Sequence, residues 1–218
     1  MGFEYSCFIS YTTNGSPLVR RFVNSLCEFL NEELPASAGK AAYLDQERLT
    51  AGFIYPEALA EALCRSACMI CVYTVPYFGP DHLYCTREFL GMEKLERKRL
   101  NDLSQGSGKY KGLIIPLVLR GSNTLPEIIT GVRQYESIED YATYDRDIIS
   151  NPHFANQLRP VCDYIAERFL ELNRIKIDPC CDCSEFKLPS NEEAHDWLNK
   201  NISPRKQEFP DFSKSDKE

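Results

Sequence analysis

The sequence lacks the features that mark membrane, exported and nucleic-acid-binding proteins. No run of apolar residues approaches the ~20 needed to span a bilayer, and residues 1–4 lack the basic segment and apolar stretch that open a secretory signal. Lysine and arginine number 25 against 32 aspartate and glutamate, which gives a formal net charge of −7. Nucleic-acid binding depends on basic side chains that neutralise phosphates. We therefore expect a cytoplasmic protein with neither a membrane nor a nucleic-acid partner.

The common nucleotide-binding motifs are also missing. No Gly-x-Gly-x-x-Gly is present, so we expect no hydride-transferring enzyme. Gly106-Ser107-Gly108-Lys109 is too short for a phosphate-binding loop and follows a helical pattern rather than a strand. We interpret residues 104–111 as a flexible connector.

The 10 cysteines do not form a metal motif. Cys180-Cys181-x-Cys183 offers three thiols with no second pair and no nearby histidine, so we expect no metal site. Other cysteines lie among apolar neighbours, where free cysteine behaves as a small buried hydrophobe. We expect reduced core thiols at Cys7, Cys27, Cys64, Cys68, Cys71 and Cys162.

The sequence does contain a regular alternation of strand-like and helix-like segments. Short apolar runs predict strands at 5–11, 41–44, 67–74, 113–119 and 132–138. Apolar residues at helical spacing predict helices that begin near residues 17, 56, 84 and 152, with a short turn at 125–130. The first helix is expected to close at 35–39 and the last near 173. A hydrophobic content of 43% in 218 residues is enough to bury a core.

This alternation predicts an α/β fold over residues 1–173. Strand–helix–strand units build a parallel sheet that is covered on both faces. Five strands indicate a flavodoxin-like, doubly wound, five-stranded parallel sheet, whose ligands bind beyond the carboxyl ends of the strands. Residues 12–15, Asp45 and the turn before Glu88 fall at that edge, so we expect the site there.

Residues 174–218 form a polar C-terminal extension. Ser190 to Glu193 fits a capping box that opens a short helix near 191–200, with Ala194, Trp197 and Leu198 on one face. The extension could dock onto the domain or bind a sensor or regulatory protein. We expect the last fifteen residues to be disordered. In the long third helix, the charges at 93–99 predict a solvated face.

Three segments resemble the signatures of a known family. Phe8-Ile9-Ser10-Tyr11 is a strand that ends in an aromatic residue, residues 44–52 form the loop after the second strand, and Tyr84-Cys85-x-x-Glu88-Phe89 opens a helix. Their order and spacing are similar to those of the Toll/interleukin-1 receptor (TIR) domain, over roughly residues 4–172. The family commonly has tryptophan where Tyr84 stands.

The resemblance implies an enzyme that cleaves NAD, with Glu88 at the position of the catalytic glutamate. Breaking the nicotinamide–ribose bond resembles glycoside cleavage through an oxocarbenium-like transition state. Nicotinamide in oxidised NAD is already a cation and leaves as a neutral molecule, so one anionic group is sufficient to stabilise the developing charge. NAD is then a substrate, and no cofactor is expected. We expect Glu88 to lie at a helix start, whose dipole favours the ionised form; the alternative is a first-turn glutamate serving only that dipole.

Further substrate-binding residues follow from the same resemblance, each with a plainer alternative. Tyr84 lies four residues before Glu88 on one helix face and could stack on nicotinamide, or pack half-buried at the helix start. Tyr11, Thr12 and Thr13 could line the pocket, or Thr12 and Thr13 could be turn residues. Asp45 could contact ribose and Arg48 a phosphate, or each could form a loop salt bridge.

The products expected of this activity are nicotinamide with ADP-ribose or a cyclic ADP-ribose isomer. In the family such activity usually requires self-association, and many small members of this kind serve bacterial antiviral defence. The alternative is a non-catalytic interaction module that recruits other TIR domains. A receiver domain is rejected, because it would need clustered acidic residues where this chain has Ser10-Tyr11-Thr12-Thr13.

Overall fold

The computed structural model describes residues 2–13, 16–44, 55–103, 111–142, 148–175 and 183–202. The strands are β1 (Tyr5–Ser10), β2 (Ala42–Leu44), β3 (Ser66–Tyr73), β4 (Ile114–Val118) and β5 (Glu136–Ser137). The α-helices are α1 (Pro17–Ala38), α2 (Tyr55–Cys64), α3 (Leu83–Asp102), α4 (Glu127–Thr130), α5 (Pro152–Arg174) and α7 (Asn191–Asn201). Short 3-10 helices are η1 (Pro80–His82), η2 (Ser122–Thr124) and η3 (Glu139–Tyr141).

The five strands form one parallel sheet in the order β2-β1-β3-β4-β5. This confirms the predicted α/β class and the five-stranded parallel sheet, and the order is that of flavodoxin-like folds. The fifth strand is shorter than predicted, because only Glu136 and Ser137 pair with β4.

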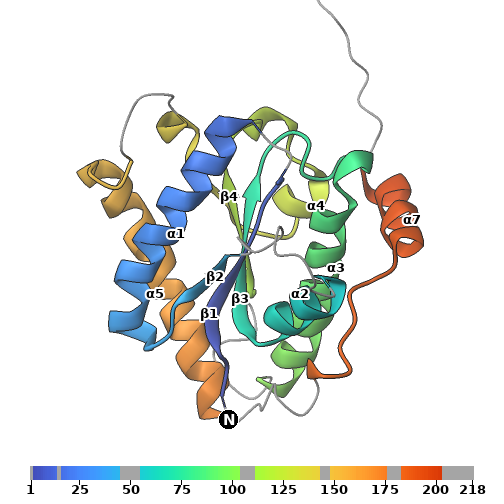
Figure 1. Cartoon of the computed structure of the whole chain (residues 1–218), viewed down its shortest axis with the longest axis horizontal. Coiled ribbons are helices and arrows are strands. Elements are labelled where there is room, and N and C mark those ends of the chain that lie inside the picture. The colour runs from blue at the N-terminus through green and yellow to red at the C-terminus, as the bar shows by residue number, and fades with distance from the viewer. Residues whose placement is uncertain are drawn as a thin grey trace, which may run out of the picture.

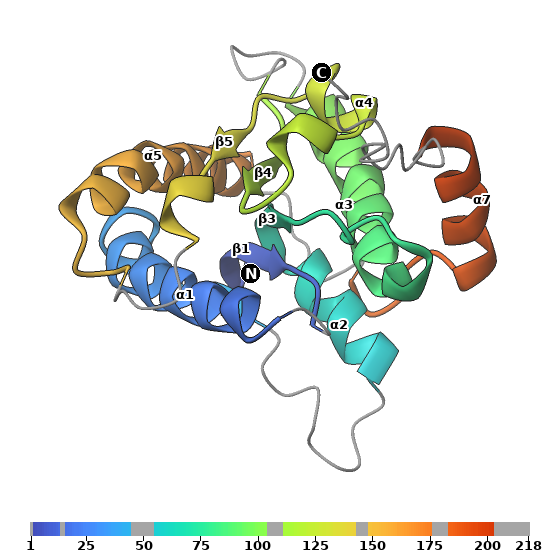
Figure 2. The same cartoon turned by 90° about the horizontal axis from the view of Figure 1, so that it is seen from above.

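Helices cover both faces of the sheet. Helices α1 and α5 lie on one face, and α2 and α3 lie on the other (Figure 1; Figure 2). All eight residues of β3, the central strand, are buried, as expected where a parallel sheet is covered on both sides. The predicted apolar stripe of α1 faces this core, and its buried members include Leu18, Phe22, Leu26, Phe29 and Leu30.

Helix α1 ends within the predicted closing segment 35–39. Pro35 lies inside its last turns, and the helix runs to Ala38. Gly39 then adopts a left-handed conformation with φ of 74° and donates its N–H to the carbonyl of Pro35. Glycine ends a helix in this way without the steric cost of a side chain. The Asn14-Gly15 turn predicted before α1 lies outside the described residues.

The predicted solvated charge face of α3 is wrong for two of its members. Glu96 and Arg99 are buried. Arg99 donates to the backbone carbonyls of Cys64 (2.6 Å) and Ser66 (2.8 Å), and burial lowers its pKa to about 10. Glu96 accepts the N–H of Leu113 at 2.5 Å and is paired with Arg133 at 2.6 Å. The two side chains are therefore hydrogen-bonded to backbone groups near the start of β3 and just before β4, and not to solvent as the sequence pattern predicted.

The prediction of a reduced thiol is wrong for Cys64, which forms a disulfide with Cys183. The other five predicted thiols (Cys7, Cys27, Cys68, Cys71 and Cys162) are free and buried. Burial raises the pKa of Cys68 and of Cys71 to about 12. The sequence could not show the disulfide, because Cys183 lies 119 positions from Cys64. Cys180, Cys181 and the glycine-rich loop 104–110 lie outside the described residues.

The predicted helix near 191–200 is present as α7. The side chain of Ser190 accepts the N–H of Glu193, and the Glu193 side chain accepts the N–H of Ser190, which completes the predicted capping box. Residues 183–202, called the C-terminal segment below, pack on the outer side of α3 (Figure 1). The predicted disordered end lies outside the described residues. Across the described chain, no helix combines the length and apolar character that crossing a bilayer requires.

Candidate functional site

The candidate site lies where the neighbouring strands β1 and β3 end. Ser10 is the last residue of β1 and pairs in register with Cys71 of β3. Helix α3 follows β3 through a turn and η1, and it packs back against β1. The predicted residues Tyr11, Thr12 and Thr13 directly follow Ser10. This arrangement brings the end of β1 against the side of α3 that carries Glu88.

Glu88 is fully buried and hydrogen-bonded to β1. Its exposed fraction is 0%, and its Oε2 accepts the hydroxyl of Ser10 at 2.5 Å. The hydroxyls of Ser10 and Tyr77 lie 2.6 Å apart. A serine hydroxyl has one hydrogen to donate. Ser10 donates it to Glu88, so Tyr77 is the donor in the second hydrogen bond. The three side chains thus form a chain that runs from Tyr77 through Ser10 to Glu88.

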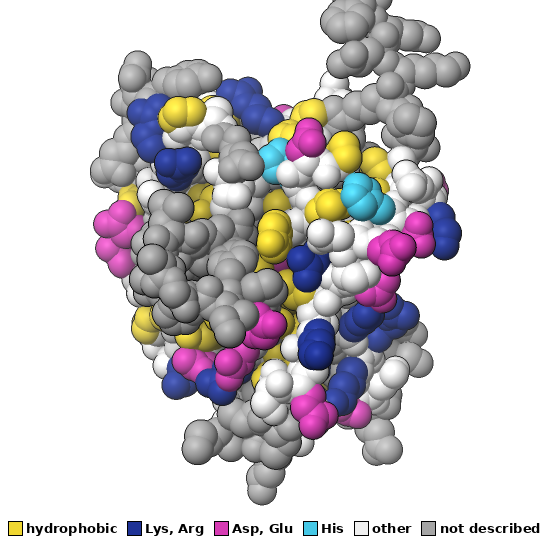
Figure 3. Space-filling view, turned by 45° about the vertical axis from the view of Figure 1, so that its right-hand side comes forward, with side chains coloured by type: hydrophobic (Ala, Val, Ile, Leu, Met, Phe, Trp, Pro, Cys, Tyr) yellow, Lys and Arg dark blue, Asp and Glu magenta, His cyan; other side chains and the backbone are white. Residues whose placement is uncertain are grey.

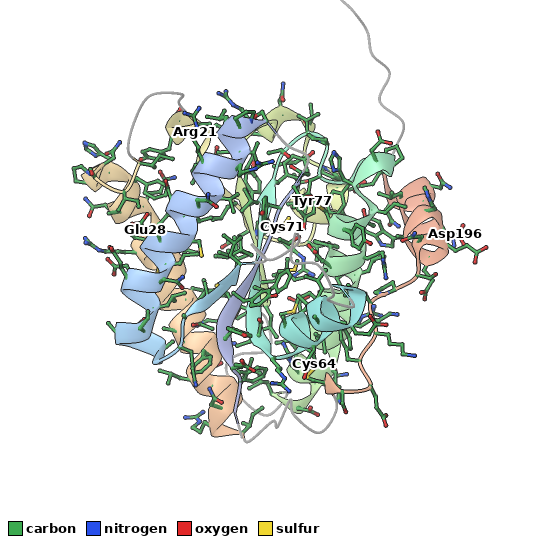
Figure 4. The ribbon with its side chains drawn as sticks, in the orientation of Figure 1. Arg21, Glu28, Cys64, Cys71, Tyr77 and Asp196 are labelled. Carbon is green, nitrogen blue, oxygen red and sulfur yellow. A yellow bond between two sulfur atoms is a disulfide. The ribbon has the colours of Figure 1, made fainter. Side chains whose placement is uncertain are left out.

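Tyr77 is suited to this donor role because its ring is also fully buried. Burial raises the pKa of Tyr77 well above its ordinary value, so the phenol keeps its proton at neutral pH. The ring is fixed by an edge contact with Phe78, with centroids 4.9 Å apart. Figure 4 shows Tyr77 next to Cys71, close to the carboxyl end of the sheet.

The helix-start argument for Glu88 is wrong in detail. Helix α3 begins at Leu83, so Glu88 is its sixth residue and lies in the second turn; no acidic residue occupies the first turn. The effect of the helix dipole falls off within the first turn. The local partner of the Glu88 carboxyl is therefore the hydroxyl of Ser10 rather than the helix dipole.

Tyr84 lies one turn before Glu88 on α3 and is exposed, at 41%. Part of this side chain is therefore accessible for stacking, and the alternative of a packing residue at the helix start stays open. The guanidinium carbon of Arg87 lies 5.3 Å from the ring centroid, within the range of a cation–π contact. Arg87 in turn donates Nε–H to the carbonyl of Pro189 in the C-terminal segment at 2.5 Å.

Thr12 and Tyr11 are held inside the protein. Thr12 is buried, and its hydroxyl lies 3.3 Å from that of Thr74 at the end of β3. The backbone carbonyl of Tyr11 accepts the thiol of Cys85 at 3.4 Å. Thr13 is half-buried. In this conformation Thr12 therefore joins the ends of β1 and β3, and Tyr11 joins β1 to α3.

Two predicted ligand residues, Asp45 and Arg48, lie outside the described residues, as does Gly52. Their proximity to Glu88 stays a prediction. Among the described residues, no three His, Cys, Asp or Glu side chains are grouped as metal ligands.

Sequence reasoning missed three residues of the site: Tyr77, Arg87 and the hydroxyl of Ser10. Ser10 was visible only as part of the Phe8-Ile9-Ser10-Tyr11 motif, and its position at the end of a buried strand signals a polar side chain at the binding edge. Tyr77 lies in a turn between two prolines, where the sequence offers no signal of its bond to Ser10. Arg87 contacts a segment that begins about 100 residues later.

A cavity of about 750 Å³ lies near this site but does not contain it. It is enclosed by the turn after β3, the loop before α4, and α7. Its lining includes Tyr73, Phe78, Glu127, His195 and Asn199, and none of the predicted site residues. The cavity is thus a feature of the C-terminal segment rather than of Glu88.

Comparison with models of protein families, with curated proteins and with solved structures finds no match for this chain.

Proposed function

We propose that this protein is an NAD-cleaving enzyme of the TIR type. It breaks the nicotinamide–ribose bond and releases nicotinamide together with ADP-ribose or a cyclic ADP-ribose isomer. The observation that carries the proposal is the pair on α3: the hydrogen-bonded carboxylate of Glu88 lies one turn after the exposed ring of Tyr84. Glu88 lies against the end of β1, and ligands of such sheets bind beyond that edge.

Glu88 acts on the ribose in this proposal. Its carboxylate holds the ribose hydroxyls and stabilises the positive charge that develops as the bond breaks. Ser10 orients the carboxylate through its bond to Oε2. Tyr84 offers an exposed ring on which the nicotinamide can stack. NAD is consumed as a substrate.

The reaction requires a change from this conformation, in which Glu88 is covered. A carboxylate with 0% exposure cannot touch a substrate, so the groups that cover it must move before the ribose can approach. We propose that self-association provides this step, with contact between TIR domains of two copies. The setting we propose is a cytoplasmic response, such as antiviral defence, in which NAD is depleted or converted into a signal.

The burial of Glu88 also favours a second candidate function. A non-catalytic module that signals through contacts between TIR domains needs no accessible carboxylate. In that case the chain from Tyr77 to Glu88 would only join β1, β3 and α3.

The test is nicotinamide release from NAD by concentrated, purified protein, with Glu88→Gln alongside. Glutamine keeps an oxygen that accepts the hydroxyl of Ser10 but removes the charge, so the fold is retained. We expect turnover to fall by about 10²–10³-fold, the scale of losing one charge-stabilising group in a transition state. Glu28→Gln is the matched control, because Glu28 is exposed on α1 across the sheet (Figure 4).

Separation of the products distinguishes a hydrolase from a cyclase. Turnover that survives in Glu88→Gln would remove Glu88 from the mechanism. Absence of turnover in both proteins, even when crowding forces them to associate, would favour the interaction module.

A further inference from the structure

The C-terminal segment is fastened along α3 at both of its ends. Cys183 is bonded to Cys64, which is the last residue of α2 and lies just before β3 (Figure 4). At the other end, the ring of Trp197 lies 5.4 Å from that of Phe78 and 5.8 Å from that of Phe89. The segment therefore runs alongside α3 from the amino edge of the sheet toward its carboxyl edge (Figure 1).

Close packing holds the middle of the segment. A side chain at Gly91 would place its Cβ 2.9 Å from Leu188 Cδ2 and 3.5 Å from Phe186 Cζ. A Cβ at this position would require Leu188 to shift, so glycine favours this close approach of the segment to α3. Lys94 and Glu193 form an exposed ion pair farther along. The space-filling view of this side shows hydrophobic side chains between the charged ones (Figure 3).

Two routes lead from the segment to the candidate site. In the first, the carbonyl of Pro189 accepts Nε–H of Arg87, and the Arg87 guanidinium lies on the ring of Tyr84. An arginine has several rotatable bonds, and the bond to Pro189 selects one position for its charge. Tyr84 thus has a neighbour whose place is set by the segment.

The second route runs through aromatic rings. Trp197 contacts Phe78, and Phe78 contacts the ring of Tyr77 edge-on. The hydroxyl of Tyr77 begins the chain that ends at Glu88. The docked segment therefore supports both Tyr84 and the chain that orients Glu88.

We propose that the C-terminal segment is a positioning element for substrate binding at Tyr84, and that the Cys64–Cys183 disulfide keeps it docked. That this substrate is NAD rests on the proposed function. While the disulfide is intact, an undocked α7 stays close to its place and returns, because a short tether gives a high effective concentration. A dithiol reduces the bond: two electrons and two protons pass to the cysteine pair, which becomes two thiols, and the dithiol becomes a disulfide. The segment then leaves α3 and Arg87 loses its anchor.

The chain carries its own reporter for this event, because Trp197 is the only tryptophan in the sequence. Its fluorescence reports docking with no other contribution from tryptophan. The experiment uses the full chain, oxidised and then treated with dithiothreitol, with the Cys64 and Cys183 thiols followed by alkylation and mass spectrometry. On reduction we expect Trp197 emission to move to longer wavelength and the KM for NAD to rise about 5-fold, the scale of losing one cation–π positioning contact. The kcat is expected to change less than the KM.

Two variants separate the steps. Cys183→Ser should show the shifted emission and the raised KM without reductant, and dithiothreitol should add nothing. Arg87→Ala should raise the KM to the same extent but leave Trp197 emission unshifted, because only the link to Tyr84 is lost. Leu170→Ala, at an exposed position of α5, is the control that should change neither.

Several outcomes overturn the proposal. If Cys64 and Cys183 are reduced and Trp197 emission stays unchanged, the disulfide does not hold the segment. If the emission shifts and the KM does not, the segment does not position the site. Should no form of the protein release nicotinamide, the proposed reaction fails separately, and calorimetric binding of NAD decides: about 5-fold weaker binding on reduction supports positioning, and unchanged binding refutes it.

Discussion

Removing the hydroxyl of Ser10 tests whether the hydrogen-bonded chain of Tyr77, Ser10 and Glu88 is present in solution. Ser10→Ala deletes the bond to the buried carboxylate and the bond from the buried phenol of Tyr77. A hydrogen bond to a charged group contributes about 1.5–3 kcal/mol and a neutral one about 0.5–1.5 kcal/mol. We therefore expect Ser10→Ala to lower the free energy of unfolding by about 2–4.5 kcal/mol. Tyr77→Phe keeps the ring and loses the neutral bond to Ser10 together with the weak one to the Cys71 thiol, so its cost is about 0.5–1.5 kcal/mol.

The double variant Ser10→Ala/Tyr77→Phe gives the decisive number. Each single variant loses the hydrogen bond between the two hydroxyls, so the sum of the two single costs includes that bond twice. The double variant loses it once. The double variant should therefore cost about 1 kcal/mol less than the sum of the single costs. The Cys71 thiol is another side-chain hydrogen-bond neighbour of Tyr77 and a weak one, so it reduces this coupling without removing it.

Urea unfolding followed by circular dichroism measures the four proteins, and equal m-values show that one transition is compared throughout. Costs that add to within about 0.3 kcal/mol would refute the bond between Ser10 and Tyr77. A Ser10→Ala cost below about 1 kcal/mol would refute the buried bond to Glu88.

Two further predictions concern the charges on and beside α3. Hydrogen bonding to the N–H of Ser190 lowers the pKa of Glu193 below its ordinary 4.5; a lowered pKa contributes stability above pH 4.5 that is lost as the pH falls through the folded value. Trp197 emission should therefore stay constant from pH 8 to 5 and shift below that, whereas in Glu193→Gln the capping contribution should not titrate. Arg133→Met leaves Glu96 buried without its ion pair and should cost about 3–5 kcal/mol in urea unfolding. Lys111→Met, which removes an exposed pair, should cost less than about 1 kcal/mol; equal costs would contradict this account of burial.

The sheet could be predicted from the sequence because its signals are local. A buried parallel strand is a continuous apolar run, and both 67–74 and 113–119 coincide with observed strands to within a residue or two. The capping box at Ser190 is equally local and is observed. Strand β5 left a weak signal because it contributes only two paired residues at the sheet edge.

The features that sequence reasoning missed all depend on contacts between distant residues. Arg99 lies in a charged run, yet it is buried. Its guanidinium donates hydrogen bonds to the backbone carbonyls of Cys64, Ser66 and Ala67. Cys64 is bonded to a cysteine on a segment whose docking no local pattern predicts. Glu88 is buried, and its hydrogen-bond partner Ser10 lies 78 residues earlier. In each case the partner of the residue lies far away in the sequence, where no local pattern identifies it.

The difference in exposure between Tyr84 and Glu88 indicates in which order the substrate would contact them in the proposed reaction. Tyr84 is 41% exposed and Glu88 is 0% exposed, so a ligand meets the aromatic ring before it meets the carboxylate. In the proposed reaction, the nicotinamide cation then meets the carboxylate of Glu88, whose attraction offsets part of the cost of taking the cation out of water. Bond cleavage removes the positive charge from nicotinamide, and with it the attraction that Glu88 exerts on that ring. The same buried carboxylate that favours entry of the cation therefore does not retain the neutral product, so nicotinamide can leave while the ribose stays in place for water or for ring closure.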